Sequence, residues 1–169
     1  MVSRIGLYEA AQPTPKEMEG MLDSCRWARD MEWDEVYTLA TYLSFYRVPE
    51  GQNIFEEHDH DRFLAIIIQG KVDILKQDLD DEEQVIATIP KGNIVGEQSL
   101  LDQQPRSATA RANQATELLV LSGSNYELLR VDEAEVALTI VEKIARTLSI
   151  RLRWTSGALV KALAGTSQP

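Results

Sequence analysis

The chain has 169 residues, of which 44% are hydrophobic and 26% charged, and its formal net charge is −10. This length is enough for one self-sufficient core, so we expect one domain with short helical additions. The acidic balance disfavours direct DNA binding, because general nucleic-acid binders depend on basic groups that neutralise phosphates.

The single cysteine, Cys25, excludes an internal disulfide and an iron–sulfur cluster that needs several thiolates from one chain. Residues 1–16 lack the uninterrupted apolar core of a secretory signal. The longest strongly apolar run, residues 63–68, is far shorter than the roughly 20 residues that cross a bilayer. We therefore expect a cytoplasmic protein that has no membrane segment.

Residues 1–43 are predicted to form a polar lead-in, which continues to about Pro15, followed by helices. Apolar residues recur at helical spacing between residues 16 and 43, in one run before Asp34 and another after it. The acidic side chains that crowd this stretch are typical of a solvated outer face.

Residues 44–130 have the pattern of short strands separated by turns. The apolar run 63–69 ends at Gly70, an alternating segment follows, and residues 78–83 resemble a polar hairpin tip. A further alternating segment, 107–112, follows an interruption, and residues 117–121 form another strand-like run. Short strands at this spacing favour an antiparallel barrel, roll or sandwich.

Residues 131–165 are predicted to form a long helix. Its apolar positions step by three, four or seven, a stripe typical of a coiled-coil seam: Ala137, Val141, Ile144, Leu148, Leu152 and Leu159. We expect a homodimer along this stripe. The same helix carries a local excess of basic residues, which suits either ordinary surface charge or an anionic ligand or acidic partner: Lys143, Arg146, Arg151, Arg153 and Lys161.

The interruption in the strand region, residues 96–109, has the composition of an anion-binding segment. Gly96 allows a backbone conformation closed to other residues, and a short helix after it would leave N–H groups free for an anion. Pro105 leads into Arg106, whose charge needs a partner if buried: Glu97, a bound anion, or both. Arginine suits bidentate recognition of phosphate.

The motifs Gly96-Glu97-Gln98-Ser99-Leu100 and Pro105-Arg106-Ser107-Ala108-Thr109 resemble the phosphate-binding cassette of the cyclic nucleotide-binding domain. The similarity covers roughly residues 33–160 and includes the family's early strand and turn and its central hairpin. It implies an α+β fold that is mainly β, an antiparallel, jelly-roll-like β-roll flanked by N-terminal helices and a long C-terminal helix.

The resemblance also implies which residues bind the ligand. Arg106 would pair with the exocyclic phosphate, Glu97 would accept a hydrogen bond from the ribose 2′-OH, and Ser107 with backbone N–H groups near Ser99 would complete the cradle. The full set of implied ligand-binding residues is Gly96, Glu97, Gln98, Ser99, Arg106, Ser107 and Thr109. A helix after the barrel would cap the base, and its candidate residues are Arg151, Arg153 and Trp154.

The implied regulatory ligand is cyclic AMP or cyclic GMP, and no other cofactor is expected. In the family a hydroxyl after the arginine blurs the preference between them, so Ser107 leaves the selectivity open. Because the chain ends soon after the long helix, we expect no DNA-binding domain and a signal that passes through an unknown protein partner or through self-association.

Three alternatives remain at this stage. The loop His58-Asp59-His60-Asp61 contains imidazoles and carboxylates that could hold a metal or haem, although a polar turn is the simpler interpretation. No nucleophile, histidine and carboxylate set is visible, so we expect no enzyme. The remaining possibility is a ligand-free interaction module on the same fold.

Overall fold

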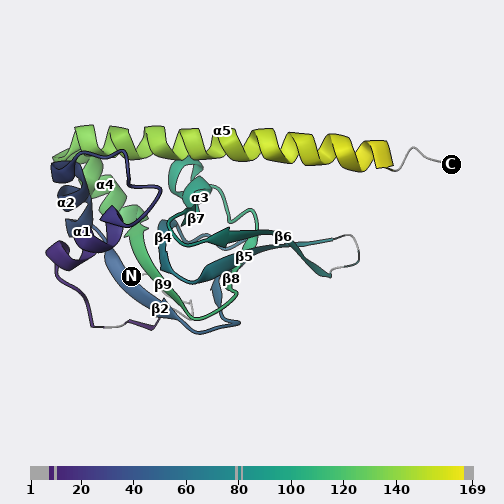
Figure 1. The fold of residues 1–169 in the computed structure, drawn as a ribbon, viewed down its shortest axis with the longest axis horizontal. Helices are drawn as coiled ribbons and strands as arrows, with labels where there is room; N and C mark the ends of the chain where they lie inside the picture. The colour runs from purple at the N-terminus through teal and green to yellow at the C-terminus, as the bar shows by residue number, and fades with distance from the viewer. Residues whose placement is uncertain (1–7, 10, 79, 81, 166–169) are drawn as a thin grey trace.

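The structure, a computed structural model, describes residues 8–9, 11–78, 80 and 82–165. Most of the expected lead-in, residues 1–7 and 10, lies outside the described residues, as do residues 166–169 after the long helix and two positions of the expected hairpin tip, 79 and 81. Figure 1 shows a β-roll with short helices at one end and one long helix along its side.

The N-terminal region contains the short strand β1 (Tyr8–Glu9) and the helices α1 (Pro15–Asp23) and α2 (Trp33–Thr41). Local interactions fix the start of helix α1. Thr14 and Glu17 form a reciprocal capping box, and Pro15 occupies the first helical turn. Strand β1, which pairs with the strand beginning at Ser44, was not predicted from the sequence.

The described strands form two antiparallel sheets, in the orders β1-β2-β9-β4-β7 and β3-β8-β5-β6. Their bounds are β2 (Ser44–Val48), β3 (Asn53–Phe55), β4 (Phe63–Gln69), β5 (Lys71–Gln77), β6 (Glu83–Pro90), β7 (Ile94–Val95), β8 (Thr109–Ala112) and β9 (Thr116–Ser122). The expected antiparallel β-roll between helices is confirmed.

The apolar run of β4 is buried on both faces because it lies between the second sheet and the helices. Ala65 and Ile67 contribute to the core between the sheets, whereas Leu64 and Ile66 contribute to the core beneath the helices. This two-sided burial explains why the strand is continuously apolar rather than alternating.

Two helices complete the fold after β9. Helix α4 (Gly123–Asp132) begins at Ser122, whose hydroxyl accepts the backbone N–H of Asn125. Most of it lies in the range 44–130 that was assigned to the roll, and it was not predicted. Helix α5 (Ala134–Gly165) matches the expected long helix. Among the described residues, no helix combines the length and the apolar character needed to cross a membrane.

The apolar stripe of α5 has two different environments. Its first half, from Ala137 to Leu148, packs against the chain's own core. Leu152 and Leu159 are exposed, as are all of residues 152–164. The expected seam from Ala137 to Leu152 therefore needs correction, because most of it is already covered within the same chain.

Candidate functional site

The interruption in the roll is formed by β7, Gly96 and the short helix α3 (Glu97–Asp102). Gly96 has φ +77°, a left-handed conformation. A Cβ atom there would lie 2.6 Å from Nη1 of Arg106 and 2.9 Å from the carbonyl oxygen of Phe63. Both the backbone angle and the close packing require glycine. No side chain caps the start of α3, so its first backbone N–H groups have no side-chain acceptor there.

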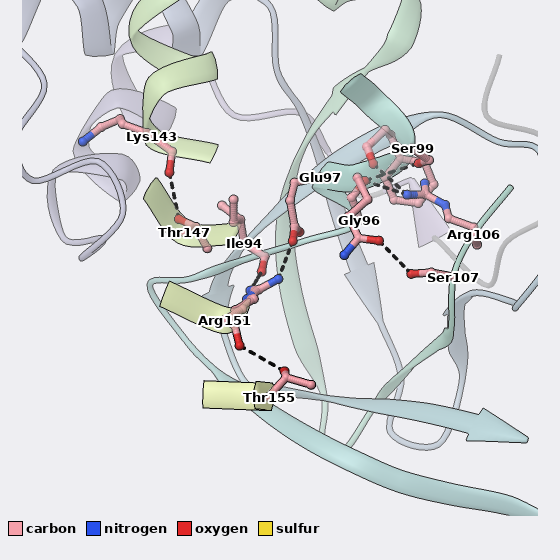
Figure 2. A network of polar contacts seen from close by, with 12 residues as sticks. Ile94, Gly96, Glu97, Ser99, Arg106, Ser107, Lys143, Thr147, Arg151 and Thr155 are labelled. Atoms are coloured by element: carbon pink, nitrogen blue, oxygen red, sulfur yellow. Dashed lines mark hydrogen bonds and ion pairs between the residues drawn. The ribbon is translucent and has the colours of Figure 1, made fainter. Parts of the chain in front are cut away.

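Arg106 is buried, with 2% of its surface exposed. Its Nη1 donates to the carbonyl oxygens of Gly96 at 2.8 Å and Phe63 at 3.0 Å. The guanidinium carbon lies 4.1 Å from the ring centroids of both Phe55 and Phe63. These contacts hold the guanidinium group in a fixed orientation between two aromatic rings. Figure 2 shows Arg106 beside Gly96 and Ser99, at the start of α3.

The other edge of the same guanidinium group has no partner. Nε and Nη2 of Arg106 are buried and make no hydrogen bond within the part of the chain that the structure describes. Burial lowers the pKa of Arg106 to about 10, although Asp61, Asp59 and Glu97 nearby partly oppose this shift. The group remains charged at neutral pH, and a buried charge with two unpaired donors is costly.

Glu97 does not form the ion pair with Arg106 that the sequence left open. Instead, its buried carboxylate accepts a charged hydrogen bond from Nη1 of Arg151 on α5. Arg151 also donates from Nη2 to the carbonyl oxygen of Ile94 at 2.7 Å. Figure 2 shows Arg151 reaching from α5 to both groups. Oε2 of Glu97 is buried and finds no hydrogen-bond partner among the described residues.

The remaining predicted cassette residues lie close by. The hydroxyl of Ser107 donates to Oε1 of Gln98 at 3.0 Å, and the hydroxyl of Ser99 donates to the Gly96 carbonyl at 3.3 Å. Thr109 starts β8, and its hydroxyl accepts the backbone N–H of Glu57 at 3.0 Å. The cassette therefore brings acidic, basic and hydroxyl groups together at one end of the roll.

The three residues predicted to cap the base have different environments in the structure. Arg151 contacts the cassette, as described above. Arg153 donates to the hydroxyl of Ser149 on its own helix, and Trp154 is 78% exposed. Phe55 and Phe63, which enclose Arg106, were not predicted as site residues. Their distance from Arg106 along the chain leaves no spacing signal by which the sequence could have identified them.

The loop that suggested a metal site instead positions Arg106. The backbone N–H of Arg106 donates to the carbonyl oxygen of Asp59 at 2.8 Å, and the N–H of His58 donates back to the Arg106 carbonyl at 2.9 Å. The side chain of His58 is 79% exposed. Among the described residues, no group of three or more His, Cys, Asp or Glu side chains is arranged to hold a metal ion.

Comparison with known proteins places this geometry in a family. The sequence profile of the family described as Cyclic nucleotide-binding domain matches residues 46–130. A solved cyclic nucleotide-binding domain from Methylobacillus flagellatus has the same fold, with a TM-score of 0.80 at 24% identity over 93% of this chain and 89% of that one.

A curated relative and a solved structure from Thermus thermophilus are both similar to this chain. The Cyclic AMP receptor protein of that organism is 34% identical over 115 residues, which cover 68% of this chain and 53% of the relative. The structure of a Thermus thermophilus Catabolite Activator Protein has a TM-score of 0.69 at 29% identity and covers 84% of this chain and 62% of its own. The chain thus spans about half the length of the curated relative. It belongs to the cyclic nucleotide-binding domain family.

Proposed function

We propose that the chain is a non-catalytic sensor that binds a cyclic nucleotide at the cassette. The observation that carries this proposal is the pair of unsatisfied groups, one basic and one acidic, on neighbouring side chains. Nε and Nη2 of Arg106 form one edge of a guanidinium group, which suits two oxygens of a phosphate. Oε2 of Glu97 is an unpaired acceptor, which suits a sugar hydroxyl.

In this proposal each group binds one part of the ligand. Arg106 binds the exocyclic phosphate through its free edge, while Glu97 accepts the ribose 2′-OH. The hydroxyls of Ser99 and Ser107 and the first N–H groups of α3 complete the phosphate cradle. Cyclic AMP is the favoured ligand, because the Thermus relative is named as a cyclic AMP receptor.

The ion pair between Glu97 and Arg151 offers a route from the ligand to α5. A ribose hydroxyl at Glu97 changes the contacts available to Arg151, which in turn fixes α5 against the cassette. A ligand shifts a conformational equilibrium only through different affinities for the two states. Because Glu97 contacts both the proposed ligand and α5, it can supply that difference.

Thermal unfolding with and without ligand tests the proposal. Cyclic AMP at about 100 times its Kd should stabilise the protein by roughly 2.7 kcal/mol, and cyclic GMP reveals the selectivity. The matched control is adenosine 5′-monophosphate, which has the same base and sugar without the cyclic phosphate. If neither cyclic nucleotide raises the unfolding temperature, the sensor proposal is wrong and a ligand-free interaction module takes its place.

A homodimer through the second half of α5 is the proposed route for self-association. Leu152 and Leu159 are exposed and seven residues apart, the repeat of a coiled-coil seam. Changing both to glutamate should convert a dimer to a monomer in sedimentation velocity. Ala158→Glu adds one negative charge on a different side of the helix and should leave the dimer intact. A wild-type protein that sediments as a monomer with and without cyclic AMP contradicts this route.

A further inference from the structure

A pocket of about 290 Å³ lies beside Arg151, outside the cassette. It is lined by residues of α5, of β6, β7 and the turn between them, and of the segment that follows α1. Lys143, Thr147 and Arg151 lie on successive turns of α5 (Figure 2). The charged and indole side chains of its lining are Arg26, Trp27, Asp30, Lys143, Arg146 and Arg151.

The pocket has an excess of uncompensated positive charge in an acidic protein. Arg151 is paired with Glu97, but Arg26, Lys143 and Arg146 form no ion pair with any residue that the structure describes. Asp30 is the single acidic residue in the lining. Burial lowers the pKa of Lys143, and the nearby charge of Arg146 lowers it further, while Asp30 and Glu35 act in the opposite direction. Like charges this close favour an anion between them.

Trp27 supplies an independent observation at the same pocket. Its side chain is 92% buried, and the indole Nε1–H has no hydrogen-bond partner in the described part of the chain. The backbone N–H of Trp27 donates to the carbonyl oxygen of Gly92 at 2.9 Å, which anchors the residue at the pocket wall. The ammonium group of Lys143 lies 5.9 Å from the Trp27 ring. Buried donors are normally paired, so this N–H is an unsatisfied donor in the wall of the pocket.

We propose that this pocket binds a small phosphate-bearing molecule, at a site separate from the cassette. Guanidinium and ammonium groups are the usual partners of phosphate oxygens, and the indole N–H adds a neutral donor. The volume lies near the lower end of the range for ligand pockets, roughly 300–1,000 Å³, which favours a compact molecule over a dinucleotide. The proposal uses no cassette residue and does not depend on the cyclic nucleotide function.

Calorimetric titration of the full chain with inorganic pyrophosphate at constant ionic strength tests the site. Saturable binding is expected, and Lys143→Gln with Arg146→Gln should weaken it by at least about tenfold, because two charged partners of the phosphate oxygens are lost. Lys161→Gln removes one positive charge from an exposed position of α5 and should leave the affinity unchanged. Arg146→Gln alone, at an exposed position, serves if the double variant folds poorly.

The Arg106→Met variant separates the two sites. Pyrophosphate binding that survives in Arg106→Met and falls in the Lys143 and Arg146 variants supports the pocket. Binding that disappears in Arg106→Met and is unchanged in the pocket variants places the anion at the cassette and overturns the proposal, as does the absence of saturable binding. Cyclic AMP binding is measured separately, so either proposal can fail without the other.

Discussion

Replacing Arg106 with methionine is expected to weaken cyclic nucleotide binding by at least about 30-fold, because removing one partner of a desolvated charged pair costs roughly 2–5 kcal/mol. The same change should leave the unfolding free energy of the ligand-free protein within about 1 kcal/mol of wild type. Two hydrogen bonds to carbonyl oxygens are lost, but two unpaired buried donors are removed with them. This result would support the proposal that Arg106 is buried with two unpaired donors because it binds a ligand.

Two further variants distinguish volume from charge at this position. Arg106→Ala should be about 2–5 kcal/mol less stable than Arg106→Met, because it leaves a cavity between Phe55 and Phe63. Arg106→Lys keeps the charge but not the planar edge, so it should retain only weak binding. Calorimetric titration gives the affinities and urea unfolding gives the stabilities. Wild-type affinity for cyclic AMP in Arg106→Met would show that the nucleotide binds elsewhere.

The sequence was most informative where the candidate site is contiguous. Glu97 and Arg106 belong to one short segment, so their spacing alone indicated a shared site. The partner of Glu97 was harder to identify, because Arg151 lies 54 positions further along and only the packing of α5 brings it near. Phe55 and Phe63 show the same limit, since apolar residues in strands predict a core and carry no sign that they enclose a cation.

The long helix shows why periodicity alone left its role unresolved. A repeat of three and four residues is produced both by packing on the chain's own core and by a coiled-coil seam. In the structure Ile144 packs on the chain's own core and is fully buried, whereas Leu159 is exposed. Strand β1 was missed for a related reason, because it has only two residues and depends on tertiary pairing more than on local pattern.

Replacing Arg151 with alanine is expected to destabilise the protein by roughly 2–3 kcal/mol, because it leaves the buried carboxylate of Glu97 uncompensated. The expected loss is below that of a fully buried pair, since the side chain of Arg151 is 35% exposed and water can partly replace it. The variant also loses the bond to the Ile94 carbonyl, so the contact between α5 and the cassette should loosen. Urea unfolding measures the stability, and amide exchange across α5 reports the contact.

A double-mutant cycle separates the charge effect from the lost packing. Glu97→Gln removes the charge but keeps the shape, so Arg151→Ala should cost less in that background, with a coupling energy of about 1–2 kcal/mol. Lys161→Ala removes a positive charge from an exposed part of the same helix and should leave the stability nearly unchanged. Purely additive effects of the Glu97 and Arg151 changes would contradict the coupling and remove the proposed route from the ligand to α5. A coupled pair would support the proposed route, in which the carboxylate of Glu97 contacts both the ribose of the ligand and Arg151 of α5.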